Sequence, residues 1–259
     1  MENDPVISNI KSLIGIIGEF ERSRFLGGVP GLVACDGGTG EAYENYALLT
    51  PGASCDVEEL IETGVGFFKK TGSPHIWPLF PGLPGSVRSS LERRGARADG
   101  EFFGMIADTG AMKGVAANDD DSFEGLWPVC ERDIRDWADA VWFGFDSGTG
   151  APESFALFAR EAGARGEISL FSLRRKLAGE TAATGLLCAS GEAAGIYYVA
   201  TRPEFRRRGL GLLVMRALLD RAAELGFKRA CLLATPSGKP LYVKCGFTET
   251  SRVLIMIHG

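Results

Sequence analysis

The stretch best suited to chemistry in this 259-residue chain is residues 206–211, three arginines followed by Gly-Leu-Gly. An apolar helical pattern follows it, so the stretch begins a helix. The first amides of a helix lack an intrahelical acceptor and carry partial positive charge. Glycine leaves such amides open to a ligand, and arginine adds charge and planar donors. The pattern predicts a diphosphate site, and a basic helix start that binds nothing is the alternative.

Two other phosphate-binding loops are excluded by their spacing. The chain has no G-x-x-x-x-G-K-[ST] motif, which a Walker A loop requires. A dinucleotide fingerprint needs a third glycine three residues after the second, and Val214 stands in that place.

The spacing of apolar residues and the turn residues between them predict the helices and strands that position this loop. A small, polar, acidic segment at 114–122 separates two halves, and we place the domain boundary between residues 121 and 122. We expect helices at 6–23, 56–70 and 86–94 with strands at 31–35 and 101–108 in the first half. In the second half we expect helices at 131–143, 152–162, 209–225 and 237–244 and strands at 167–176, 181–190, 195–204, 228–235 and 251–258.

Composition and charge narrow the class of protein. Hydrophobic residues at 45% and charged residues at 24% are typical of a globular chain. No apolar run is long enough to span a membrane, and the N-terminus lacks a secretory pattern, so we expect a cytoplasmic protein. Six dispersed cysteines and two distant histidines favour neither a disulfide framework nor a metal site. Basic residues outnumber acidic ones 18 to 15 after residue 121, which suits an anionic ligand but not obligate nucleic-acid binding.

A second motif lies near the C-terminus, where Tyr242 is followed by Gly246 and Phe247 in LYVKCGF. Together with residues 206–211, which match [QR]-x-x-G-x-[GA], it resembles the GNAT superfamily of acyl-CoA-dependent N-acetyltransferases over roughly residues 123–259. Thr235-Pro236 stands where the family more often has Asn. The resemblance implies an α/β (α+β) fold with a mixed, mostly antiparallel sheet flanked by helices. Residues 122–259 would be the catalytic domain, and residues 1–121 a smaller degenerate GNAT-like lobe or, alternatively, an unrelated α/β lobe.

The resemblance also implies a reaction and a donor site. Acetyl-CoA would be the cosubstrate, without a metal, and its acetyl group would pass to a primary amine by direct attack in a ternary complex. The acceptor would be a small molecule or a peptide, the protein a monomer or homodimer, and a non-catalytic acyl-CoA-binding or regulatory module is the alternative. The implied donor-binding residues are Val199, Ala200 and Thr201 on a strand and Arg206, Arg207, Arg208, Gly209, Leu210, Gly211 and Leu212 at the loop.

The catalytic candidate is Tyr242, which matches the family's acid and would protonate the leaving thiolate. A core aromatic at the start of a helix is the alternative. No base for the amine is assigned, because Glu167 and Glu192 flank strands and each is equally suited to capping a turn. We expect Cys245 to be a small buried residue rather than a nucleophile.

Overall fold

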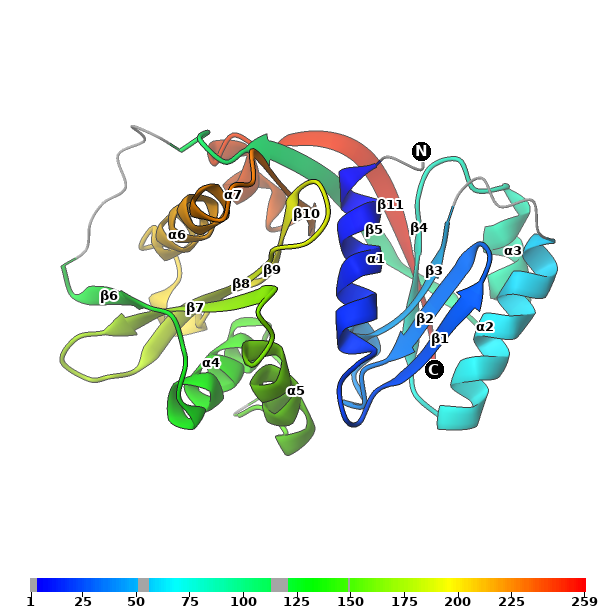
Figure 1. Ribbon diagram of the computed structural model, residues 1–259, viewed down its shortest axis with the longest axis horizontal. Coiled ribbons are helices and arrows are strands. Elements are labelled where there is room, and N and C mark those ends of the chain that lie inside the picture. The colour runs from blue at the N-terminus through cyan, green and yellow to red at the C-terminus, as the bar shows by residue number, and fades with distance from the viewer. Residues whose placement is uncertain (1–3, 51–55, 113–120, 149) are drawn as a thin grey trace. The chain divides into compact units, whose positions relative to one another are not determined.

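The computed structural model describes residues 4–50, 56–112, 121–148 and 150–259, which form two compact units (Figure 1). The first unit comprises Met1–Gly104, Leu233–Ser237 and Glu249–Gly259, and the second comprises Met105–Leu232 and Gly238–Thr248. The boundary between residues 121 and 122 stays a prediction, and most of the predicted linker lies outside the described residues.

The first unit is a sheet with helices packed on it, in the strand order β1-β2-β3-β4-β11-β5. Its last-but-one strand comes from the C-terminus of the chain: β11 pairs antiparallel with β4, from Leu254 opposite Leu79 to His258 opposite His75. The core gathers Phe68, Trp77 and Leu91, all fully buried. The elements are α1 (Pro5–Ile17), β1 (Arg24–Val29), β2 (Leu32–Asp36), η1 (Ala42–Glu44), β3 (Asn45–Leu49), α2 (Val57–Thr71), β4 (His75–Leu79), α3 (Ser86–Arg93), β5 (Arg97–Asp108) and β11 (Thr248–His258).

The second unit is a sheet in the order β10-β9-β8-β7-β6, with α4 and α5 on one face and α6 on the other (Figure 1). All its neighbours pair antiparallel except β9 and β10. Gly185 of β8 lies between both layers: its carbonyl accepts a bond from Trp137 Nε1 (3.2 Å), and a Cβ there would meet Leu218 Cδ1 at 2.6 Å. The elements are β6 (Phe123–Leu126), α4 (Glu131–Gly144), α5 (Glu153–Gly163), β7 (Ile168–Arg175), β8 (Thr181–Cys188), β9 (Ala194–Thr201), η2 (Pro203–Phe205), α6 (Leu210–Glu224), β10 (Arg229–Ala234) and α7 (Lys239–Lys244).

The predicted fold class is confirmed, but four strands were not predicted. Strands β1 and β6 lie at the edge of a sheet, where β1 is largely exposed and β6 has four residues. Strands β3 and β4 lie inside the first sheet but have only five residues each, and so short a run does not show the period that separates a strand from a helix. The first helix ends at Ile17 rather than residue 23, because the amides of Glu19 and Phe20 bond to Ile16 and Ile17, three residues back, in a tighter turn.

Candidate acyl-donor site

The loop before α6 has a backbone arranged to present amides. Arg207 and Gly209 have φ values of 62° and 80°, in the left-handed region, which costs a non-glycine residue about 1–2 kcal/mol. Among the described residues, the amides of Arg207, Gly209 and Gly211 donate to no backbone carbonyl, whereas the amide of Leu212 donates to Gly209 (2.9 Å). Backbone turned in this way forms an anion-binding concavity, so three amides of the loop are available to a diphosphate.

The side chain of Arg206 clamps the loop to two neighbouring elements. Its Nε donates to the carbonyl of Thr201 (3.1 Å), where β9 ends, and its Nη2 donates to the carbonyl of Gly144 (2.9 Å), where α4 ends. Nη2 also pairs with the carboxylate of Asp146 at 3.1 Å. Asp146 lies 60 residues away in the chain, so no local pattern revealed this contact. In this structure the Arg206 guanidinium holds the loop in place.

The other two arginines of the loop differ in how they are engaged. The Arg208 guanidinium lies 4.8 Å from the centroid of the Phe123 ring, a cation–π distance. Arg207 is exposed, and within the described ranges its side chain has no hydrogen bond or ion pair. Of the three, Arg207 is therefore the side chain that can turn to an anion without breaking a described contact.

Gly209 and Gly211 are each required for a different physical reason. A Cβ on Gly209 would meet nothing within 4 Å, so its positive φ and the open space above it are what require glycine. A Cβ on Gly211 would lie 3.0 Å from Leu241 Cδ2. Gly211 thus lets α6 pack closely on α7, the helix that carries Tyr242, while Leu210 beside it is buried in the core.

Strand β9 carries a β-bulge at the residues predicted to hold the donor. Its register with β8 passes from Leu186 opposite Tyr197 to Thr184 opposite Ala200, so β9 has one extra residue. Tyr198, in the bulge, has φ 51°, and its carbonyl accepts a bond from Thr184 Oγ1 (3.1 Å). Bulges re-aim the main chain and recur beside active sites, which fits a donor role for the next residue, Val199.

Strands β9 and β10 pair over only a short distance. Their parallel register joins Ala194 with Ala230 and Gly195 with Cys231, although β9 continues to Thr201. Beyond Gly195 and Cys231 the two strands therefore no longer pair. An extended ligand arm can add to a sheet by main-chain hydrogen bonds at such a place, as peptides do in β-augmentation.

Tyr242 lies on α7, half-buried, with its ring edge-on to Phe247 at 6.1 Å between centroids. Burial, and secondarily the nearby thiol of Cys245, raises the pKa of Tyr242 above its usual value near 10. The hydroxyl is therefore protonated at neutral pH. Transfer of a whole proton to a thiolate whose conjugate acid has a pKa near 8.5 is uphill by at least about 2 kcal/mol. The phenol is suited to donating a hydrogen bond to a leaving sulfur, rather than to losing its proton.

Three other side chains were considered for a catalytic role: the thiol of Cys245 and the carboxylates of Glu167 and Glu192. Cys245 is buried, and burial raises the pKa of its thiol to about 11, so it is not a nucleophile at neutral pH. Glu167 pairs with Arg165 (3.9 Å) and Glu192 pairs with Arg229 (3.7 Å). Both carboxylates are already engaged in ion pairs with arginines, so neither is assigned the role of base for the amine.

No cluster of three or more His, Cys, Asp or Glu side chains that could hold a metal ion is found in the described part of the chain. The described helices include none that is both long enough and apolar enough to cross a membrane.

Comparisons with known proteins agree with the class of fold described above, an α/β domain with a mixed sheet flanked by helices. Residues 120–247 match the model of the acetyltransferase (GNAT) family. The chain is a member of the GNAT superfamily, and this membership supports acyl transfer from coenzyme A in general. A search of the curated proteins finds no match.

Solved structures extend the likeness over both units. A GCN5-related N-acetyltransferase from Kribbella flavida is 15% identical, with 98% of this chain and 96% of that one covered and a TM-score of 0.69. A tandem GNAT protein from the clavulanic acid biosynthesis pathway is 13% identical over 99% and 96%, with a TM-score of 0.63. A GCN5-related N-acetyltransferase from Sphaerobacter thermophilus is 14% identical over 83% and 72%, with a TM-score of 0.62. At these identities the likeness shows the fold, and it includes the predicted two-lobed GNAT architecture.

Proposed function

We propose that this protein is an N-acetyltransferase that moves the acetyl group of acetyl-CoA to a primary amine by direct attack in a ternary complex. The observation that carries the proposal is the loop at residues 206–211, whose strained backbone presents amides at the start of α6. Backbone held in a costly conformation is typical of ligand sites.

The donor would be held by main chain from two elements. The amides of Arg207, Gly209 and Gly211, with the Arg207 guanidinium, would bind the diphosphate, and Arg206 would keep the loop in register with β9. The main chain of Val199, Ala200 and Thr201 would hold the pantetheine arm beyond the end of the β10 ladder. The cosubstrate supplies an activated thioester, and strand amides already oriented toward its carbonyl would stabilise the oxyanion.

Tyr242 would act at the leaving group. A protonated phenol that donates a hydrogen bond to the sulfur stabilises the thiolate as it forms, without a complete proton transfer. Such a charge-assisted bond is worth about 1.5–3 kcal/mol, or roughly 10- to 150-fold in rate.

The acceptor would be a small-molecule or peptide amine. Residues 1–121 hold 18 acidic and 10 basic residues, and such a charge balance favours the approach of a cationic amine. The cytoplasmic location and the monomeric or homodimeric state remain predictions from the sequence.

The test combines binding with turnover. Calorimetry with coenzyme A should show uptake by the wild-type protein, and Arg207→Ala should weaken it. Arg88→Ala on α3, an exposed arginine whose partner is Glu92 on the same helix, is the matched control and should leave binding unchanged. Thiol release from acetyl-CoA with a panel of primary amines then measures catalysis. Binding without turnover on any amine would favour a non-catalytic acyl-CoA-binding module, and no binding would refute the proposal.

A further inference from the structure

The first unit contains a cavity that the proposed donor site does not use. Its volume is about 720 Å³, within the range of small-molecule pockets. It lies between the C-terminal part of α2 and the beginning of β4. Its walls include Val65, Gly66, Phe68, His75, Arg94 and His258.

The two histidines of the chain stack on one another in the wall of this cavity, 5.1 Å apart between ring centroids. His75 Nδ1 lies 3.2 Å from the carbonyl of Ser73, and a carbonyl only accepts, so Nδ1 carries the proton and donates. His75 Nε2 is then a bare acceptor, and it has no partner among the described residues. Burial, reinforced by His258, lowers the pKa of His75 to about 4, so its ring is neutral at pH 7.

An unpartnered acceptor in a side chain that is 1% exposed is costly, because the atom has lost its hydrogen bonds to water without gaining a partner. Buried polar atoms in native proteins nearly always have a partner, and an exception calls for an explanation such as a missing ligand. His258, whose Nε2 donates to the carbonyl of Arg94 (2.7 Å), stacks over the His75 ring. Nε2 is covered in this structure, so a donor in the cavity reaches it only after a movement of the side chains around it.

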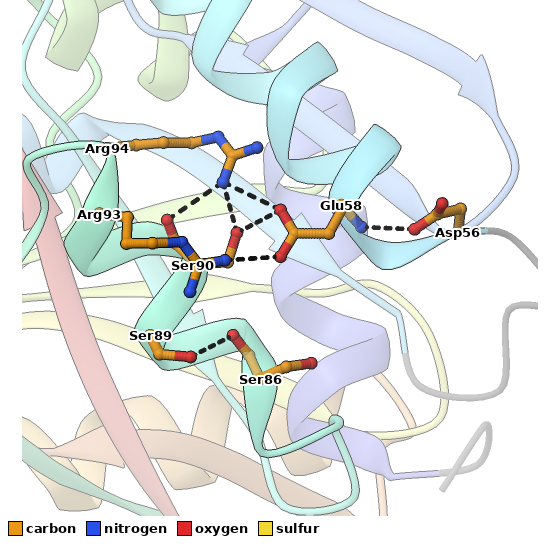
Figure 2. A network of polar contacts seen from close by, with 7 residues as sticks. All are labelled: Asp56, Glu58, Ser86, Ser89, Ser90, Arg93 and Arg94. Carbon is orange, nitrogen blue, oxygen red and sulfur yellow. Dashed lines mark hydrogen bonds and ion pairs between the residues drawn. The ribbon is translucent and has the colours of Figure 1, made fainter.

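Positive and negative side chains around the cavity balance one another, so the cavity does not select an ion. The guanidinium of Arg94 is turned to the carboxylate of Glu58 (3.0 Å) and to Ser90, as Figure 2 shows. Glu62 and Lys69, both lining the cavity, are seven residues apart on α2 and have opposite charges. Two turns of helix separate them by about 10 Å. The charges of these side chains therefore balance, and together they favour neither an anion nor a cation.

The remaining surface is apolar and aromatic. The Phe68 ring is stacked on His75 at 3.8 Å between centroids, and Val65 lies on the same side of α2. Gly66 has open space where a Cβ would be. We propose that this cavity is a binding site for a small neutral molecule with an aromatic body and one hydroxyl or amide donor, which hydrogen-bonds to Nε2 of His75.

The test compares two probes with the same aromatic ring on the full-length protein. Phenol has the donor, and methoxybenzene has the same ring without it. Titration followed by NMR should show saturable phenol binding that shifts the signals of Val65, Gly66 and His75. Methoxybenzene should bind at least about tenfold more weakly, since one hydrogen bond to a buried acceptor is worth that factor. Equal affinity for both probes, or no shifts at these residues up to the solubility limit, would overturn the proposal.

Two variants separate the cavity from non-specific binding. Gly66→Leu fills the open space and favours the helix, so it should abolish phenol binding without unfolding the unit. Gly15→Leu on α1 is the matched control, because Gly15 is also helical with open space around it and does not line the cavity. His75→Phe should retain stacking on Phe68 and remove the preference for phenol. Phenol binding that survives Gly66→Leu, or a preference that survives His75→Phe, would contradict the assignment.

Discussion

Replacing Gly209 by alanine tests whether the strained loop is a binding device. Gly209 has φ 80° and open space at its Cβ position, so alanine adds backbone strain without a clash. The left-handed conformation costs a residue with a Cβ about 1–2 kcal/mol. If the loop relaxes in the free protein, coenzyme A binding must restore the strained form. The Kd measured by calorimetry should then rise about 5- to 30-fold.

Gly226 provides the matched control at the other end of the same helix. Its φ is 89°, and a Cβ there also meets nothing within 4 Å, so Gly226→Ala imposes the same strain far from the loop. A loss of stability of this size corresponds to a fall in Tm of about 2–8 °C. Gly226→Ala should lower Tm by that amount and leave the Kd for coenzyme A unchanged. Equal coenzyme A affinities in the two variants would refute the reasoning.

Three further predictions concern the reaction, the loop clamp and pH. Tyr242→Phe preserves the ring contact with Phe247 and should lower kcat roughly 10- to 150-fold, with an unchanged KM for acetyl-CoA. Steady-state rates measure this change, and an unchanged kcat would show that the tyrosine has no part in the mechanism. Asp146→Asn frees Arg206 from an exposed ion pair worth under about 1 kcal/mol, so calorimetry should show a rise in Kd below about fivefold that disappears at high salt. A lowered pKa for His75 means that the unfolded chain binds a proton that the folded chain does not. The free energy of unfolding should therefore fall by up to about 3 kcal/mol as pH drops from about 6.5 to 4. Denaturant titrations at pH 7 and 4.5 measure this fall, and His75→Phe should reduce it.

The sequence alone identified the features that depend on neighbouring residues. The start of α6 at residues 209–211 was predictable from glycine and the apolar helix that follows, and the diphosphate site there stays a prediction. Tyr242 was chosen because LYVKCGF resembles a GNAT motif, and its role also stays a prediction. Helices α2, α4 and α6 were predictable because one face of each packs on a sheet, which imposes a helical period on the apolar residues.

The tertiary structure decided what depends on residues far apart in the chain. The ion pair between Asp146 and Arg206 joins residues that are 60 positions apart in the chain. The pairing of β11 with β4 places His258 opposite His75. The bulge at Tyr198 depends on the register with β8. Periodicity records which face of an element is buried but not which element covers it. The role of Arg206 as a clamp and the stacked histidines of the cavity therefore became visible only when the chain was folded.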